Sequence, residues 1–241
     1  MIARMPPAPA WSFIVPAHDE APLIGATLQS IRDAADACGF SHECIVVDDD
    51  STDATAEVAR ACGARVVPVA FRHIAATRNA GASAATGARL CFVDADTRID
   101  ARVLRGAADA LDGGAVGGGC AVALDGDVRW TVRLFTAMVM HVFRWTRVTP
   151  GCFVFCTRAA FDATGGFDTA YYAGEDVAFS RALATVGRIA ILRETVRTSD
   201  RKLRTFGVPD HLRLMLRFAL RGRRILRSRD HLGLWYDKRR H

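Results

Sequence analysis

Cysteine patterns that signal a metal site are missing from this sequence. No CxxC pair occurs among its seven cysteines, and Cys152 and Cys156 lack His or Cys partners at zinc spacing. Cys44 and Cys91 fall in strand-like apolar runs, where a thiol acts as a small hydrophobe. Because scattered thiols without a framework are typical of a reducing compartment, we expect reduced structural cysteines in a cytoplasmic protein.

Targeting and membrane-spanning patterns are also absent. Residues 1–12 show no apolar core and no small-residue cleavage pattern, so they predict no signal peptide. Three prolines within residues 1–10 indicate a flexible N-terminal arm. A very apolar stretch, residues 128–146, is too short and too charged to predict a membrane span. A buried helix is favoured there, and an interfacial helix is the alternative because Arg and Trp flank the stretch.

Phosphate-binding glycine loops of the common kinds are missing too. No dinucleotide fingerprint follows the first expected strand. Five glycines cluster within residues 113–119, but they precede a strand rather than open a helix, and no Lys-Ser/Thr pair follows them. We therefore interpret this cluster as turns and close backbone packing.

Charge is distributed unevenly along the chain. Residues 197–241 hold 14 Lys/Arg and 4 Asp/Glu, a net charge of +10, whereas residues 1–196 hold 18 basic and 22 acidic groups, a net charge of −4. A basic segment of this kind indicates an anionic partner. Within it, residues 211–226 have the pattern of an amphipathic helix with one stripe of arginines.

Length and pattern predict one large α/β domain. The chain has 241 residues, 50% of them hydrophobic, which is enough for one core. Strand-like and helical patterns alternate with short connections, as in a parallel doubly wound sheet. The expected strands are residues 11–16, 43–47, 64–69, 89–93, 120–124 and 151–156. The expected helices cover residues 21–39, 54–62 (capped by Ser51 and Thr52) and 74–86. Residues 161–168 are expected to hold a helix end and a turn, and a later helix opens near residue 174.

Three of the expected strands end in acidic residues. The segments that follow them are His18–Glu20, Asp48–Asp50 and Asp94–Asp96. The carboxyl ends of parallel strands line the ligand crevice of an open α/β sheet, so these acids are expected to converge on one edge. Like charges this close repel, and burial makes the repulsion worse. The convergence therefore predicts a site that holds a cation or a hydrogen-bonding ligand.

Six short segments in this chain resemble motifs of the family-two glycosyltransferases, which have the GT-A fold. They occur in the family's order between about residues 11 and 205. The segments are Val15–Glu20, Val47–Asp53, Arg78–Gly81, Asp94–Asp96, Gly165–Asp168 and Gly174–Asp176. The resemblance implies a nucleotide-sugar donor, Mg²⁺ or Mn²⁺, and an inverting single displacement. It also implies a single GT-A domain with a mainly parallel central sheet, helices on both faces and a basic helical C-terminal extension.

The resemblance also assigns residues to the donor. The nucleotide-sugar-binding set is Pro16, Ala17, Glu20, Asp49, Arg78, Asp94, Ala95 and Asp96. In this set Asp49 would accept a hydrogen bond from the base, and Arg78 would approach the base or the diphosphate. Asp96 would ligate the metal, and Asp94 would contact the metal or the ribose.

On the acceptor side, the resemblance makes Asp176 the general base, with Glu175 beside it. Apart from the resemblance, Gly151 and the basic residues Arg201, Lys202 and Arg204 are expected as contacts to the diphosphate or the acceptor. The resemblance divides the chain into a donor half, residues 11–110, and an acceptor half, residues 111–200. The basic extension is residues 201–241.

The chain departs from the family pattern at two places. His18-Asp19 replaces the usual aromatic-Asn pair, and Asp50 replaces the usual Gly. Neither change removes a carboxylate that the chemistry needs, but both bear on the choice of nucleobase. The Gln-x-x-Arg-Trp motif of the processive members is missing, which argues against a polymerase.

Two other functions remain open from the sequence. A sugar-nucleotide nucleotidyltransferase would need a Gly- and Arg/Lys-rich loop after the first strand, and residues 16–23 have none. A non-catalytic protein that binds a membrane surface or nucleic acid through its basic segment would leave the acidic strand ends unexplained, and these acids would repel nucleic acid. Peripheral attachment to an anionic membrane through residues 211–226, with a lipid-linked acceptor, is an expectation, as is simple packing of that helix on the domain.

Overall fold

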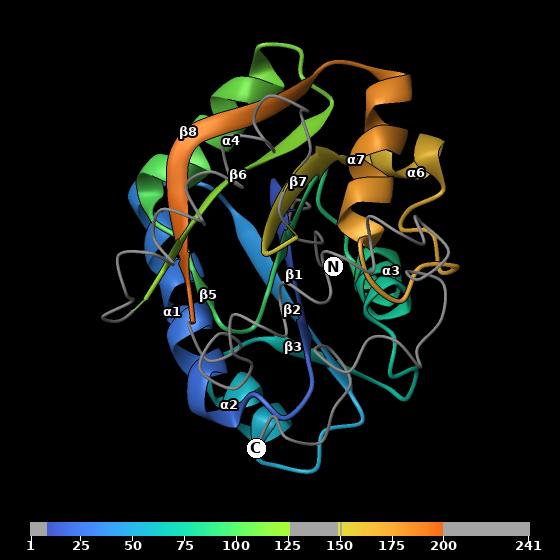
Figure 1. Cartoon of the computed structure of the whole chain (residues 1–241). Coiled ribbons are helices and arrows are strands. Elements are labelled where there is room, and N and C mark those ends of the chain that lie inside the picture. The colour runs from blue at the N-terminus through green and yellow to red at the C-terminus, as the bar shows by residue number, and fades with distance from the viewer. Residues whose placement is uncertain (1–8, 126–148, 150, 200–241) are drawn as a thin grey trace, which may run out of the picture.

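The computed structural model describes residues 9–125, 149 and 151–199, which form one eight-stranded sheet with helices on both faces (Figure 1). The strands are β1 (Trp11–Ala17), β2 (His42–Asp49), β3 (Arg65–Val69), β4 (Arg89–Val93), β5 (Thr97–Arg98), β6 (Gly117–Leu124), β7 (Phe153–Thr157) and β8 (Ile189–Thr198). The helices are α1 (Ala21–Cys38), α2 (Thr55–Ala61), α3 (Ile74–Ala84), α4 (Ala101–Asp112), α6 (Arg158–Thr164) and α7 (Glu175–Val186). Most of the expected arm, the apolar stretch 128–146 and the extension 201–241 lie outside the described residues.

The sheet has the order β3-β2-β1-β4-β7-β6-β8-β5. β1 to β4 are mutually parallel, as expected. β7 runs antiparallel to both of its neighbours, β6 and β8 are parallel, and β5 is antiparallel to β8. The chain leaves β1 towards β2 and β3 on one side and returns to β4 on the other. Ligands bind at the carboxyl ends of parallel strands beside such a switch point, so the topology alone indicates the ends of β1 and β4.

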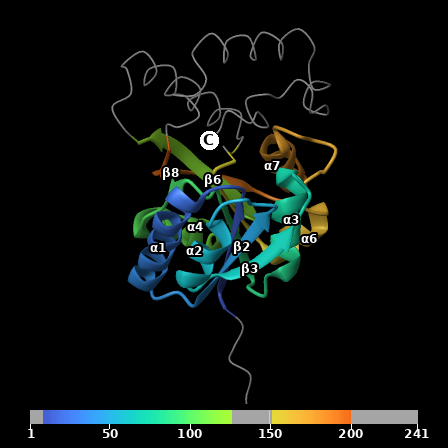
Figure 2. The same ribbon diagram turned by 90° about the horizontal axis from the view of Figure 1, so that it is seen from below.

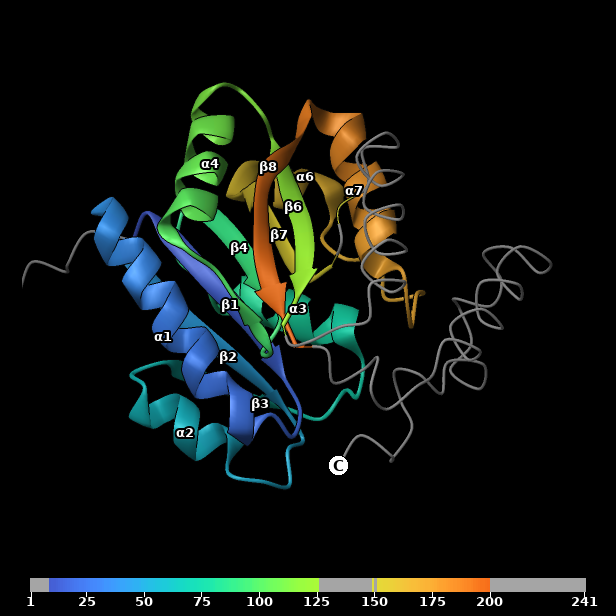
Figure 3. The ribbon, with the colours of Figure 1, turned by 60° about the vertical axis from the view of Figure 1, so that its left-hand side comes forward.

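The core has two layers, one on each face of the sheet. Side chains of β1 alternate between them: Phe13 and Val15 join one apolar cluster and Ile14 joins the other. The first cluster is covered by α1, α2 and α4, and the second by α3, α6 and α7 (Figure 2, Figure 3). The prediction of an α/β domain with helices on both faces is confirmed.

Glycines permit close packing where helices and strands meet. A Cβ on Gly81 of α3 would lie 2.3 Å from Ile14 Cγ2, so only glycine lets α3 approach β1 this closely. Three glycines of the expected cluster, Gly117–Gly119, form the start of β6, so this strand begins earlier than the expected residue 120. A Cβ on Gly118 would lie 1.9 Å from Ala190 O of β8. Gly114 has a φ of +84° and forms the turn after α4. The cluster is turn and close packing, as predicted.

Two local predictions were wrong or incomplete. Ser51 and Thr52 do not cap α2, because the turn after β2 continues until Ala54 before the helix begins. Ser51 Oγ instead accepts from Asp19 N, and Asp53 Oδ1 accepts from Thr55 N. The expected set of elements also omitted α4, β5 and β8. α4 carries a clear start signal, since the Asp100 carboxylate accepts from the backbone amides of Arg102 and Val103.

Several of the cysteines lie in the core as predicted. Cys91, Cys120 and Cys156 are buried. Burial raises the pKa of the Cys44 and Cys120 thiols to about 12 and also raises the pKa of Cys156. These thiols are therefore protonated and unreactive at neutral pH. Within the described residues, no helix has the length and apolar character needed to cross a membrane.

Candidate active site

The candidate site lies where β1 and β4 part, at the carboxyl ends of the parallel strands (Figure 3). β4 pairs with β1 only from Trp11 to Ile14. Pro16 lies beyond that ladder and pairs with Val47 of β2. Proline has no N–H to donate, so it suits a position where one neighbouring strand has already separated. Ala17 follows it and is 4% exposed.

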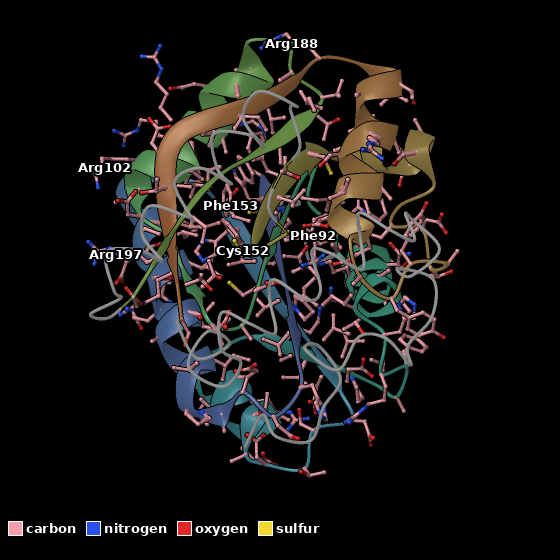
Figure 4. The ribbon with its side chains drawn as sticks, viewed as in Figure 1. Phe92, Arg102, Cys152, Phe153, Arg188 and Arg197 are labelled. Atoms are coloured by element: carbon pink, nitrogen blue, oxygen red, sulfur yellow. The ribbon has the colours of Figure 1, made fainter. Side chains whose placement is uncertain are left out.

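The loop Asp94–Asp96 follows β4 directly and is held through its backbone. Thr27 Oγ1 of α1 donates to Ala95 O at 2.7 Å, and Asp94 N donates to Cys152 O at 3.1 Å. Figure 4 shows Cys152 and Phe153 beside Phe92, where β7 begins next to the end of β4. Ala95 is buried, whereas both aspartates are partly exposed. Ala95 therefore anchors the loop, and its two neighbours present carboxylates.

Arg78 of α3 is a buried cation at the centre of the site. Its side chain is 2% exposed, and its Nη1 donates to Glu175 Oε1 at 2.7 Å. Its Nη2 donates to Asp94 Oδ1 at 2.8 Å and to Gly151 O at 2.9 Å. The two carboxylates raise the pKa of Arg78 above its usual value, against the lowering effect of burial. Arg78 thus joins the end of β4, the segment before β7 and the start of α7.

The guanidinium of Arg78 packs against aromatic side chains. Its Cζ lies 5.2 Å from the centroid of the Phe167 ring, which is a cation–π contact. Phe167 stacks on Phe179 of α7 with ring centroids 4.2 Å apart, and it meets Phe92 edge to face at 4.9 Å. Asn79, next to Arg78, bonds both backbone groups of Phe167. The motifs that contain Arg78 and Phe167 therefore form one packed unit.

The first turn of α7 holds two carboxylates in different environments. Gly174 precedes the helix with a φ of +72°, which glycine adopts without strain. Glu175 is 7% exposed and points to Arg78. Asp176 is partly exposed, and a Cβ on Gly151 would lie 2.8 Å from its Oδ2. The Asp176 carboxylate therefore packs directly over Gly151.

The pKa of Asp176 is raised to about 7. Desolvation by the surrounding protein is the largest cause, and the neighbouring charge of Glu175 adds to it. The cation of Arg78 and a hydrogen bond from Val177 N act in the opposite direction. A carboxylate with a pKa near neutrality is suited to accept a proton at physiological pH.

Asp49 at the end of β2 is 6% exposed and bound within the protein. Its Oδ1 accepts from Phe71 N and Arg72 N at 2.7 and 2.8 Å. Its Oδ2 accepts from His73 N and Thr77 Oγ1 at 3.1 and 2.8 Å. The carboxylate that the resemblance assigns to the nucleobase here organises the loop between β3 and α3. Arg78, assigned to the base or the diphosphate, is likewise engaged inside the protein.

The departure at His18-Asp19 has a structural explanation. Asp19 has a φ of +52°, and its Oδ1 accepts from Thr52 N at 2.6 Å and from Asp53 N at 3.3 Å. His18 Nδ1 donates to Asp49 O at 2.8 Å. Glu20 N donates to Thr55 Oγ1 at 2.8 Å, and Glu20 lies directly before α1. The loops after β1 and β2 are thereby tied together along the site.

Asp94 and Asp96 are the residues here that could hold a divalent cation. Hard cations such as Mg²⁺ take one or two protein carboxylates and complete their shell with phosphate oxygens and water. Asp96 Oδ1 accepts from Thr198 Oγ1 at 3.2 Å, and Asp94 shares one oxygen with Arg78. No group of three His, Cys, Asp or Glu side chains able to hold a metal occurs among the described residues. The two carboxylates therefore suit a metal ion that is also bound by the phosphates of a ligand.

One set of expected site residues lies beyond the part of the chain that the structure describes, and one cavity lies apart from the site. Arg201, Lys202 and Arg204 lie outside the described residues. A cavity of about 480 Å³ lies at the opposite edge of the sheet, near the start of β2 and β3, with Arg32, Glu43 and Arg65 in its lining. The cavity lies at the starts of these strands and the acidic residues lie at their ends, so the cavity is not part of the candidate site.

The whole arrangement combines a sheet switch point, an acidic loop after β4 and a carboxylate pair at the start of α7. The family model described as "Glycosyl transferase family 2" matches residues 12–222. The chain belongs to this family. The resemblance read from the six motifs is confirmed.

Relatives and solved structures agree with this placement. A 4,4'-diaponeurosporenoate glycosyltransferase of Staphylococcus haemolyticus is 35% identical over 96 residues, which are 37% of this chain and 24% of the relative. The mannosyltransferase PcManGT from Pyrobaculum calidifontis, in complex with GDP-Man and Mn²⁺, has a TM-score of 0.65 and 22% identity, over 89% of this chain and 65% of that one. S. aureus TarS 1–349 has a TM-score of 0.62 and 17% identity, over 93% and 77%. The structures show a shared GT-A fold, and the chain spans only part of these relatives.

Sequence reasoning missed the residues that hold the site together. Thr27, Ser180 and Thr149 act through hydrogen bonds: Ser180 Oγ donates to Asp176 O at 2.8 Å, and Thr149 N donates to Ser180 Oγ at 3.2 Å. The bonds from Thr27 to Ala95 and from Thr149 to Ser180 join segments that are distant in sequence, so no spacing pattern marks them. The bond from Ser180 to Asp176 lies within α7 at a spacing of four residues. Asn79 lies within the motif Arg78–Gly81, so the sequence indicated its position but not its contact with Phe167.

Proposed function

We propose that this protein is a metal-dependent, inverting glycosyltransferase that moves a sugar from a nucleoside-diphosphate donor to an acceptor hydroxyl. The observation that carries the proposal is the position of Asp176. A carboxylate with a pKa near 7 packs over Gly151, while Arg78 connects that glycine to Asp94 of the acidic loop. Arg78 thus links the proposed base, Asp176, to the acidic loop Asp94–Asp96. Membership of the family favours this function over a nucleotidyltransferase or a non-catalytic binding protein.

The donor belongs at the carboxyl ends of β1, β2 and β4, in the half formed by residues 11–110. The switch point between β1 and β4 supports this placement, as does the set of loops tied together by Asp19 and Asp49. Structures with the same fold bind GDP-Man, UDP or UDP-GlcNAc, which supports a nucleotide sugar as the class of donor. The acceptor then belongs with residues 111–200, where Gly151 and Asp176 lie.

Asp94 and Asp96 would hold Mg²⁺ or Mn²⁺ together with the donor diphosphate. A divalent cation bound there stabilises the negative charge that develops on the departing nucleoside diphosphate. The mannosyltransferase with the same fold was solved with Mn²⁺, which supports divalent metal use. The residues of this chain supply the two partly exposed carboxylates and the fixed backbone of Ala95 between them.

Asp176 would act as the general base. It takes the proton of the acceptor hydroxyl while that oxygen forms a bond to the anomeric carbon from the face opposite the diphosphate. The bond from the anomeric carbon to the diphosphate oxygen breaks in the same displacement, so the configuration inverts and no sugar–enzyme intermediate forms. General-base help of this kind contributes on the order of 10²–10⁴-fold.

Membrane attachment is part of the proposal for the basic segment. Residues 211–226 have an arginine stripe and an apolar side, a pattern that suits binding in the plane of an anionic membrane and a lipid-linked acceptor. As an alternative role for the basic residues, Arg201, Lys202 and Arg204 would hold the diphosphate or a phosphorylated acceptor. Liposomes with anionic lipid should bind the protein at low salt and release it as salt rises. Failure to bind such liposomes at low salt would remove this part of the proposal.

Calorimetric titration tests the donor site. UDP, GDP and dTDP are titrated with and without Mn²⁺ into wild type, Asp96→Asn and the control Asp36→Asn, which changes an exposed carboxylate on α1. Binding of one nucleotide that requires Mn²⁺, is lost in Asp96→Asn and persists in the control is the expected result. If none of the three nucleotides binds, the acidic loop is not a donor site.

A further inference from the structure

The buried guanidinium of Arg78 has contacts that do not match a donor-binding role. Both terminal nitrogens donate to groups inside the protein, and the Phe167 ring covers one face of the side chain. Its Nε is buried and has no hydrogen-bond partner among the described residues. A group made to contact a diphosphate would keep part of its donor fork open to solvent. Arg78 is instead 2% exposed.

We infer that Arg78 is a positioning residue, which holds Glu175 and Gly151 so that the carboxylate of Asp176 faces the reacting hydroxyl. The inference rests on the proposed function. In this role Arg78 acts through Glu175 and Gly151 and does not contact the donor.

The first part of the argument is the rotation of α7. Consecutive residues of an α-helix point about 100° apart around its axis. The ion pair from Arg78 Nη1 to Glu175 Oε1 directs Glu175 into the protein. With Glu175 fixed, Asp176 must point to a different side of the first turn. That side is where Gly151 lies.

The second part is the position of Gly151. Arg78 Nη2 holds the Gly151 carbonyl at 2.9 Å, and the site of a Cβ on Gly151 is 2.8 Å from Asp176 Oδ2. A real Cβ does not approach this closely, so the carboxylate occupies the space that glycine leaves. One guanidinium therefore fixes both the helix turn that carries the base and the backbone on which the base packs.

The third part is the support of Arg78 itself. The Phe167 ring lies beneath the guanidinium, and Asn79 bonds Phe167 N and O. Phe167 also stacks on Phe179, which lies one turn after Asp176 in α7. Groups locked in this way by packing and hydrogen bonds hold a catalytic side chain within the narrow tolerance that catalysis needs.

Arg78→Met, Arg78→Lys and Gly151→Ala test the inference. Gly151→Ala keeps Arg78 and its ion pairs but pushes on the Asp176 carboxylate, so it remains informative if Arg78→Met folds poorly. Arg158→Met is the matched control, because Arg158 also donates to backbone carbonyls, those of Ala82 and Ala85, but lies away from the site. Lysine lacks the planar fork and should restore function only in part.

The readouts are kcat for sugar transfer and the Kd of the nucleoside diphosphate with Mn²⁺. For Arg78→Met and Gly151→Ala we expect kcat to fall by about 100-fold or more, while Kd changes by less than about 5-fold. The opposite pattern, a Kd raised more than about 10-fold with kcat at saturation preserved, would mean that Arg78 contacts the donor and would overturn the inference.

A further readout needs no turnover. The carboxyl ¹³C signal of Asp176, titrated with pH, reports the charges that face it: Glu175, Arg78 and Asp94. We expect a higher titration midpoint in Arg78→Met and an unchanged one in Arg158→Met. An unchanged midpoint in Arg78→Met contradicts the inference. If wild type binds no nucleotide, the proposed function fails, and this titration still decides whether Arg78 controls Asp176.

Discussion

Asn79 holds Phe167 by both backbone groups: Asn79 Oδ1 accepts from Phe167 N at 2.9 Å, and Asn79 Nδ2 donates to Phe167 O at 2.8 Å. The two residues are 88 positions apart in the chain. Their contact explains why an Arg-Asn pair and a Gly-Gly-Phe segment occur together in this sequence. Asn79 fixes the backbone of Phe167, and the Phe167 ring supports the guanidinium of Arg78.

Gly166 and Gly165 provide a matched pair for this contact. Both have positive φ, +80° and +75°, so alanine meets a similar backbone strain at each position. A Cβ on Gly166 would lie 2.7 Å from Asn79 Oδ1, whereas a Cβ on Gly165 would meet nothing within 4 Å. We expect Gly166→Ala to lower the free energy of unfolding by about 1–3 kcal/mol more than Gly165→Ala, because its Cβ also collides with Asn79 Oδ1, which holds Phe167 N, and with the Phe161 ring. Urea unfolding measures this difference. Equal losses of unfolding free energy in the two variants would show that these contacts add no stability.

Asp19 makes the fold sensitive to acid. Burial alone would raise its pKa, but hydrogen bonds from the Thr52 and Asp53 backbone and the charge of His18 outweigh burial and lower the pKa below 3.8. A carboxylate with a lowered pKa in the folded state stabilises the protein above its unfolded pKa, and this contribution is lost as pH falls below about 4. We expect Asp19→Asn to lower the melting temperature at pH 7 and to reduce the loss of stability between about pH 5 and about pH 3.

The control for Asp19→Asn is Asp36→Asn, at an exposed carboxylate of α1. Scanning calorimetry at several pH values gives the comparison. If Asp19→Asn and Asp36→Asn show the same pH dependence, the hydrogen bonds to Asp19 do not contribute to acid stability.

Asp176 should affect stability in the opposite sense. Its pKa is raised to about 7 in the folded protein, chiefly by desolvation, so the folded state binds this proton more tightly than the unfolded chain does. Stability is then lost as pH rises from the unfolded value of 3.8 through about 7. At pH 8 we expect Asp176→Asn to melt higher than wild type, by roughly 2–4 °C for each kcal/mol of relieved penalty. At pH 4 the variant and the wild type should have the same melting temperature. A lower melting temperature for the variant at pH 8 would contradict the desolvation of the Asp176 carboxylate.

The parts of the fold that follow periodic patterns could be predicted from the sequence. β1 and β2 are short, mostly apolar runs and α1 has helical spacing of its apolar residues, and the acids at the ends of β2 and β4 mark the edge where the site lies. α4 has a buried stripe that includes Val103, Ala107 and Leu111 and was omitted, although its spacing is helical. β8 is harder, because a register shift in its pairing with β6 breaks the alternation of its side chains.

The inward direction of the charged side chains could not be predicted. Asp49 and Arg78 occupy motif positions that the family resemblance assigns to the donor, yet both are buried by partners from distant segments. Asp49 receives its partners from the loop before α3, and Arg78 receives its partners from the ends of β4 and α7. Whether a charge is buried depends on whether such partners satisfy it, and that is a property of the folded chain.

The central claim, that Asp176 is the base of sugar transfer, is tested most directly by Asp176→Asn. The variant keeps the size of the side chain but cannot take a proton at neutral pH. Transfer to an unactivated hydroxyl acceptor and binding of the nucleoside diphosphate with Mn²⁺ are measured on wild type and variant. We predict that transfer falls by about 10²–10⁴-fold while nucleotide binding is unchanged. Near-normal transfer by Asp176→Asn would contradict the account.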